Sequence, residues 1–318
     1  MTMRISGLYR SAVYLLAGIG ILANSATLLA QQLDDNFLNS TVFIKRPLDA
    51  GQESRGTGFL IFHEIAKDVA TGRSTYQIVL VTNKHVLPAE QSNFHQITIK
   101  IAVRNGPATE TKDLPIDILG NDGKFLRTVA MNPNPQIDVA AVDIGLQITK
   151  EKAEFIIHAV ETGKALTTDL LLPIKDFKDA SIGIGTQIYL LGYPAGYSDP
   201  RNISPILRIG VISTEPDKDY SFDEITTKAA NLPSPIHGFL IDANVYPGSS
   251  GSMIVRRTNI VTGFNPGGKA SVPYILGIVA DSMGIHDSGI NANERVGLGV
   301  VFSSDTILET IKLLPTVQ

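Results

Sequence analysis

Short apolar stretches recur along the chain, and each has the length of a β-strand rather than that of a helix. Glycine, proline, asparagine and aspartate residues separate them, as is typical of strands joined by turns. The clearest examples are residues 77–81, 97–102, 187–191 and 274–279. Because amphipathic helices do not alternate with these strands, the pattern favours a barrel or sandwich over a parallel α/β sheet.

Two stretches depart from this pattern. Residues 150–163 have the composition of a helix but no clear cap, and the segment 150–179 is the expected connector between two β units. Polar residues 303–306 precede apolar side chains at helical spacing, namely Ile307, Ile311 and Leu314. We therefore expect a capped, amphipathic C-terminal helix at about residues 304–314.

The first thirty residues resemble a targeting segment. Arg4 and Arg10 precede an apolar run over residues 12–23, and small or polar residues follow. This is the layout of a secretory signal peptide. The alternative is an uncleaved anchor, because residues 12–30 are just long enough to cross a bilayer. Asn24 and Ser25 interrupt the run and favour cleavage, so the sequence predicts an exported protein, periplasmic or secreted.

Composition excludes several function classes. The chain has 27 Lys and Arg against 31 Asp and Glu, a net charge of −4, and no basic cluster. A nucleic acid or an anionic lipid surface is therefore not an expected partner. The absence of cysteine excludes disulfides, thiolate catalysis and thiolate zinc sites. We expect no metal and no organic cofactor.

Three short segments carry the candidate chemistry: residues 81–86, 137–140 and 247–252. They supply His85, Asp138 and Ser250, in that order. A serine hydroxyl needs an adjacent general base, and that base needs a carboxylate to fix its tautomer and stabilise its cation. The order His, Asp, Ser is that of chymotrypsin-type enzymes, whereas subtilisin-type chains and α/β-hydrolases have other orders.

Each of the first two residues has rivals in the sequence. Asp138 precedes an apolar strand, and a carboxylate in such a place is rare unless it is paired. Asp117 and Asp143 are the alternatives, but Asp143 should face the other side of that strand because side chains alternate. The other histidines lie in no matching motif: His63, His95, His158, His237 and His286.

Ser250 competes with Ser249 and Ser252 for the role of nucleophile. Only Ser250 has Gly248 two residues before it and Gly251 directly after it. This spacing lets backbone N–H groups turn inward, so we expect an oxyanion hole with the amides of Gly248 and Ser250 as donors.

The chain resembles the chymotrypsin-fold (trypsin-like) serine peptidases, and among them the bacterial HtrA/Deg-type protease domain. Matching segments are spread over about residues 36–315: 56–60, 81–86, 138–143, 192–196, 210–213, 242–252 and 297–300. The resemblance implies an all-β protein of two six-stranded antiparallel β-barrels with a C-terminal helix. The first barrel would span about 36–150, the connector 151–179 and the second barrel 180–303.

The resemblance also implies the activity: a serine endopeptidase that acts on polypeptide substrates through an acyl-enzyme. The rival class is a catalytically silent, secreted binding protein with the same fold, since a fold alone does not guarantee activity. No regulatory peptide-binding (PDZ) domain is expected after residue 315, and the sequence does not predict an oligomeric state.

Two departures from the family pattern bear on activation and specificity. Ser249 stands where pancreatic-type peptidases carry an aspartate that captures a newly freed N-terminal amine, so that ion pair cannot form here. Asn244 should lie near the base of the primary specificity pocket, with residues Ala280, Asp281 and Ser282 along its edge. An uncharged base argues against cleavage after Lys or Arg, and Asp281 is the one carboxylate that could reverse this.

Overall fold

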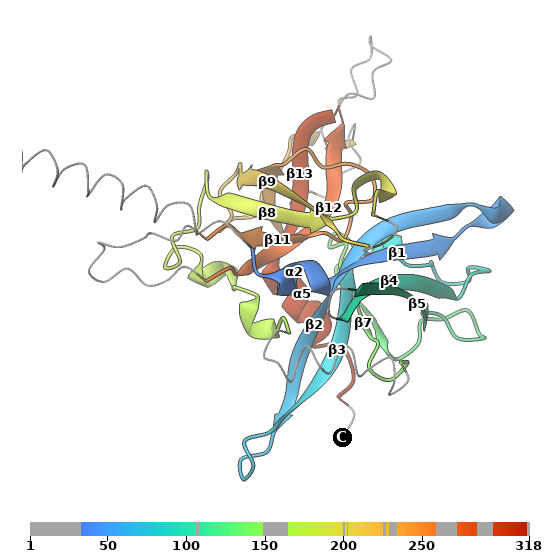
Figure 1. Ribbon diagram of the computed structural model, residues 1–318. Coiled ribbons are helices and arrows are strands. Elements are labelled where there is room, and N and C mark those ends of the chain that lie inside the picture. Colours follow the sequence, from blue (N-terminus) through green and yellow to red (C-terminus); the bar gives the residue numbers. More distant parts are fainter. Residues whose placement is uncertain are drawn as a thin grey trace, which may run out of the picture.

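The computed structural model describes residues 33–105, 108–148, 165–199, 201, 203–224, 227–228, 234–258, 272–284 and 295–316. The expected targeting segment and the helical stretch at 150–163 lie outside these residues. Within them the protein is built almost entirely of antiparallel strands, arranged as two sheets that meet along one side (Figure 1).

The first sheet contains seven strands in the order β5-β4-β1-β2-β3-β7-β6. All neighbouring pairs are antiparallel. The strands are β1 (Thr41–Pro47), β2 (Glu53–Lys67), β3 (Ser74–Thr82), β4 (Gln96–Asn105), β5 (Ala108–Asp117), β6 (Val129–Met131) and β7 (Ala140–Asp143).

The second sheet closes on itself as a six-stranded barrel in the order β10-β13-β12-β11-β8-β9. Its strands are β8 (Gln187–Gly192), β9 (Ile206–Ile212), β10 (Gly238–Asp242), β11 (Met253–Arg256), β12 (Ile275–Gly284) and β13 (Arg295–Ser303). Closure leaves this barrel without a free edge.

Alternation along the central strands of the first sheet feeds two separate cores. In β2, Phe59 and Ile61 belong to one apolar cluster, while Leu60 and Phe62 belong to another. Successive side chains of a strand point to opposite faces, so a strand buried on both faces reads as a continuous apolar run. The cluster with Leu60 and Phe62 lies on the inner face of the first sheet, and the cluster with Phe59 and Ile61 lies between the two sheets.

The core between the sheets explains why they form one unit. It joins residues of β2, β3 and β7 to residues of β8, β11 and β12, and the C-terminal helix α5 (Ser304–Ile311) adds Ile307 and Ile311 to it. A third cluster fills the second barrel. Side chains that lie where the two sheets meet are therefore supported by a well-packed apolar core.

The remaining helical elements are short. They are α2 (Asp35–Ser40) and the 3₁₀ turns η1 (Asp49–Gly51), η2 (Lys84–Val86), η3 (Thr168–Leu170), η4 (Ile174–Asp176) and η5 (Pro194–Gly196). Among the described helices, none is long and apolar enough to cross a membrane.

The all-β class, the closed six-stranded second barrel and the C-terminal helix confirm the expected fold. The first unit differs in detail, because its described strands form a seven-stranded sheet rather than six strands in a closed barrel. The extra strand is β6, only three residues long and paired with β7 alone. The helix ends at Ile311 instead of 314, and its cap Ser303 makes no side-chain capping bond.

Candidate active site

His85 lies in the η2 turn, directly after strand β3 ends at Thr82. Its Nδ1 is 2.5 Å from Asp138 Oδ2, and its backbone N–H donates to Asp138 Oδ1 at 3.2 Å. An ionised carboxylate only accepts hydrogen bonds, so Nδ1 carries the hydrogen and Nε2 is the basic nitrogen of the neutral ring. The His85 side chain is half exposed, as a group that exchanges protons with a bound molecule must be.

Asp138 is fixed by contacts from the histidine turn itself. Asn83 Nδ2 donates to the Asp138 carbonyl at 2.6 Å, and Lys84 Nζ donates to the Asn134 carbonyl at 2.9 Å. Burial lowers the pKa of Lys84, and the charge of Asp138 partly offsets that shift. The two segments therefore hold each other in register before any substrate binds.

The rival carboxylates lie elsewhere. Asp117 is exposed at the end of β5, where it accepts from Gln96 Nε2 at 2.6 Å. Asp143 is buried at the end of β7 and accepts from Gln77 Nε2 at 3.2 Å. These hydrogen bonds involve neither His85 nor Asp138.

The segment 246–252, here called the serine loop, is folded into two consecutive turns. Ser249 N donates to the Tyr246 carbonyl and Ser252 N to the Ser249 carbonyl, both at 2.9 Å. Gly248 and Gly251 have φ values of +85° and +89°, a region that favours glycine. The two glycines that singled out Ser250 in the sequence therefore shape the turns around it.

Thr57 of β2 ties the serine loop to the first sheet. Its N–H donates to the Ser250 carbonyl at 2.9 Å, and its Oγ1 donates to the Gly248 carbonyl at 2.8 Å. The Thr57 carbonyl in turn accepts from Thr82 Oγ1 at 2.7 Å, three residues before His85. This chain of bonds brings the serine loop against the strand that leads into His85. Thr57 was part of a recognised motif, but the sequence did not reveal this role.

Only one of the three serines in the loop is accessible. Ser249 and Ser252 are fully buried, whereas Ser250 is partly exposed and its Oγ donates to the Ala280 carbonyl at 3.1 Å. Within the described part of the chain, the N–H groups of Gly248 and Ser250 donate to no backbone carbonyl. Two neighbouring N–H groups thus remain available beside an accessible hydroxyl.

The expected specificity residues are described only in part. Asn244 is exposed, has a φ of +48° and donates its N–H to the Gly297 carbonyl at 3.1 Å. Ala280 is buried on β12. Asp281 and Ser282 pair with Val300 and Gly299 of β13, but their side chains lie outside the described structure.

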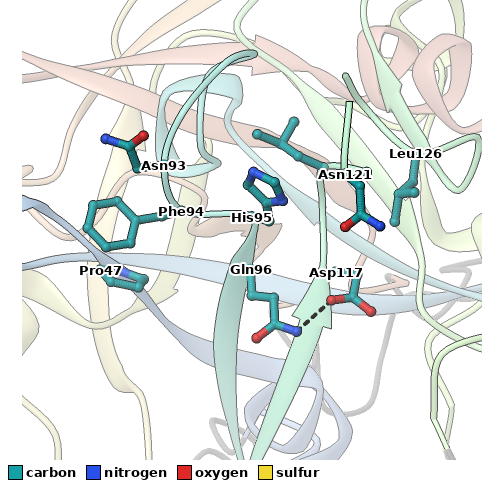
Figure 2. Close-up of a pocket in the computed structure, with 10 residues that line it drawn as sticks. Pro47, Asn93, Phe94, His95, Gln96, Asp117, Asn121 and Leu126 are labelled. Atoms are coloured by element: carbon teal, nitrogen blue, oxygen red, sulfur yellow. Dashed lines mark hydrogen bonds between the residues drawn. The ribbon is translucent and has the colours of Figure 1, made fainter. Parts of the chain in front are cut away.

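A separate pocket of about 650 Å³ opens where β4 begins and β5 ends (Figure 2). Phe94, His95 and Asp117 are among the residues that line it. None of its lining residues belongs to the predicted site. Among the described residues, no group of three histidine or acidic side chains could hold a metal ion.

Comparison with known proteins gives the class. A family model described as "Trypsin-like peptidase domain" matches residues 56–263, well over half of the chain. The chain therefore belongs to the trypsin-like peptidase family and is a serine-type peptidase, which confirms the family predicted from the motifs. The narrower resemblance to the HtrA/Deg branch stays a prediction.

No curated protein sequence matches the chain. Solved structures with a similar fold include the active Rv3671c protease of M. tuberculosis, at 16% identity and TM-score 0.46, covering 89% of this chain and 83% of that one. Protease Anisep of Arthrobacter nicotinovorans is 13% identical with a TM-score of 0.47, and the match covers 88% of this chain and 97% of that one. The serine endoprotease of Yersinia pestis is 14% identical with a TM-score of 0.42, and the match covers 92% of this chain and 66% of that one.

Proposed function

We propose that this peptidase is an endopeptidase that cleaves polypeptides through His85, Asp138 and Ser250 and an acyl-enzyme intermediate. The observation that carries the proposal is the 2.5 Å contact between His85 Nδ1 and Asp138 Oδ2. Thr57 links the strand that leads into His85 to the serine loop, in which Ser250 is the accessible serine. No metal or organic cofactor takes part in the proposed reaction.

The first half of the reaction forms the acyl-enzyme. The Ser250 hydroxyl leaves the Ala280 carbonyl by rotation about its Cα–Cβ bond and attacks the substrate carbonyl carbon, while His85 Nε2 takes its proton. Asp138 stabilises the imidazolium that forms. The oxyanion accepts hydrogen bonds from the Gly248 and Ser250 amides. His85 then gives the proton to the leaving amine, and the C–N bond breaks.

The second half returns the enzyme to its starting state. A water molecule attacks the acyl carbon, and His85 Nε2 again takes a proton. Collapse of the second tetrahedral intermediate breaks the bond to Ser250 Oγ, which recovers the proton from His85. The products are a free amine and a carboxylic acid, so atoms and charges balance without any further reactant.

Labelling with a fluorophosphonate tests this proposal. We expect covalent modification at Ser250 in the wild type and loss of both label and peptidase activity in Ser250→Ala, by about a million-fold in turnover. Ser74→Ala is the matched control, since Ser74 is equally half-buried but lies at the start of β3. An unlabelled, inactive wild type would instead support a silent binding protein. Label on Ser249 or Ser252 would contradict the choice of nucleophile.

We also infer that the protein acts outside the cytoplasm, as a periplasmic or secreted enzyme. The basic, apolar and small-residue order of residues 1–30 supports this. Fractionation of cells expressing the full chain tests it, with the N-terminus of the recovered protein determined by mass spectrometry. Recovery of uncleaved protein in the cytoplasm would contradict it.

A further inference from the structure

A charged side chain from a distant strand reaches into the serine loop. Arg208 of β9 donates from Nη1 to the Asn244 carbonyl and from Nη2 to Ser249 Oγ at 2.8 Å. Its guanidinium carbon lies 5.4 Å from the centre of the Tyr246 ring. One guanidinium therefore touches the chain at three points within the six residues that precede Ser250.

These contacts fall on a segment with left-handed backbone conformations and a buried hydroxyl group. Asn244 and Gly248 both adopt left-handed φ, and for Asn244 that conformation carries a steric cost. Ser249 is fully buried, so its hydroxyl needs a partner inside the protein. Arg208 satisfies both the strained segment and the buried hydroxyl with a single planar group.

The guanidinium gives up hydration to make these contacts. Burial lowers the pKa of Arg208, and interaction with Tyr246 partly offsets that shift. Among the described atoms, Arg208 Nε is buried and has no hydrogen-bond partner. A guanidinium remains protonated at neutral pH, so a desolvated cation lies beneath the loop. Such a group is a costly way to stabilise a fold, because packed apolar residues often serve as well.

Neutral groups from the first sheet hold the same loop. Thr57 binds the carbonyls of Gly248 and Ser250. The Gly248 and Ser250 N–H groups belong to the preceding peptide units, whose carbonyls, on Pro247 and Ser249, accept from the N–H groups of Ala195 and Ser252. Arg208 binds two other residues of the same segment, Asn244 and Ser249. One residue from each sheet therefore holds this loop.

We propose that Arg208 is a positioning residue for the oxyanion hole: its guanidinium fixes the segment 244–249 so that the Gly248 and Ser250 amides point at the substrate carbonyl. This rests on the proposed function, in which Ser250 is the nucleophile. Arg208 itself touches no reacting atom in this proposal. Its contribution belongs to the transition state, where the oxyanion forms, rather than to substrate binding.

The test compares Arg208→Met and Arg208→Lys with the wild type. Removal of one oxyanion-hole donor typically lowers kcat by about 10²–10³-fold, and we expect Arg208→Met to lower kcat by about 10²-fold with KM near the wild-type value. The rate of fluorophosphonate labelling at Ser250 should fall in parallel. Arg208→Lys should recover part of the loss, since an ammonium keeps the charge but cannot span both acceptors.

Arg257→Met is the matched control. Arg257 directly follows β11 of the second barrel, donates from Nη1 to Gln187 Oε1 at 3.0 Å, and has its guanidinium carbon 5.8 Å from the centre of the Tyr189 ring. It contacts no residue of the serine loop in these bonds, so we expect its kcat to match that of the wild type. A kcat for folded Arg208→Met equal to that of Arg257→Met would overturn the proposal. A higher KM with an unchanged kcat in Arg208→Met would also overturn it.

Ser249→Ala keeps the proposal testable if Arg208→Met fails to fold. It removes one acceptor of the guanidinium, so kcat should fall by a smaller factor, and adding Arg208→Lys should cost less than the product of the two single effects. Independent effects would overturn the proposal. A wild type that is not labelled at Ser250 would overturn the proposed function, and this inference with it, before any Arg208 variant is made.

Discussion

A Cβ atom on residue 251 would lie 1.8 Å from the carbonyl oxygen of Thr57, so the backbone of the serine loop rests directly on that of β2. The carbonyl cannot easily yield, because it also accepts the 2.7 Å hydrogen bond from Thr82. Gly251 has a φ of +89° in addition. Space and backbone conformation thus both require glycine beside the predicted nucleophile.

We expect Gly251→Ala to lower the free energy of unfolding by about 2–5 kcal/mol, since overpacking costs about 1–3 kcal/mol and left-handed φ about 1–2 more. Gly72→Ala is the control for the backbone term, because Gly72 has a φ of +69° but open space around its Cα. That variant should lose only about 1–2 kcal/mol. Urea unfolding measures both, and equal losses would contradict the steric argument.

The sequence was informative where chemistry depends on neighbouring residues. His85, Asp138 and Ser250 each lie in a short segment whose own residues shape the surroundings, so local reading could select them. Arg208 could not be found in this way. Its partners lie 36 and 41 positions away, and it stands before the matching segment 210–213 rather than inside it. Only the closure of the second barrel brings β9 beside the serine loop.

The fold shows the same division. Strands β3, β4, β8 and β12 coincide with apolar runs visible in the sequence, because their side chains are buried. Helix α2 has six residues and β6 has three, too few for a periodic pattern to emerge. β6 exists because β7 offers it a partner, which is a tertiary effect.

Asp138→Asn should preserve the fold and lower kcat by about 10⁴-fold, because the amide cannot hold the His85 tautomer or stabilise its cation. Asp117→Asn is the control: it removes an equivalent charge from an exposed site at the end of β5. Steady-state kinetics with a fluorogenic peptide distinguish the two. Wild-type kcat in Asp138→Asn would remove this carboxylate from the mechanism.

Asp143 should make stability depend on pH. Burial raises the pKa of its carboxyl, and hydrogen bonds from the Gly145 backbone, the Gln77 side chain and the Leu146 backbone only partly offset this. The folded protein then binds the proton more tightly than the unfolded chain does. The resulting stability is fully present below the unfolded-state pKa and is lost as pH rises through the raised, folded-state pKa.

The difference in unfolding free energy between wild type and Asp143→Asn isolates this effect. We expect the wild type to lose stability relative to the variant as pH increases from about 3.5 to about 7, because only the wild type must ionise a buried carboxyl. Chemical unfolding at a series of pH values measures the difference. A wild type that gains stability relative to the variant over this range would mean that the hydrogen bonds, and not burial, dominate.

Cleavage specificity follows from the surroundings of Asn244, if this residue lies at the base of the primary pocket. A basic substrate side chain that enters a partly desolvated pocket needs a carboxylate, and Asn offers only a dipole. The Arg208 guanidinium, bound to the Asn244 carbonyl, adds positive charge at the same place. We therefore expect cleavage after small or medium uncharged residues rather than after Lys or Arg.

A peptide library varied at the residue before the scissile bond measures the preference, with Asp281→Asn as the companion variant. Dominant cleavage after Lys or Arg that disappears in Asp281→Asn would show that Asp281, and not Asn244, sets the specificity.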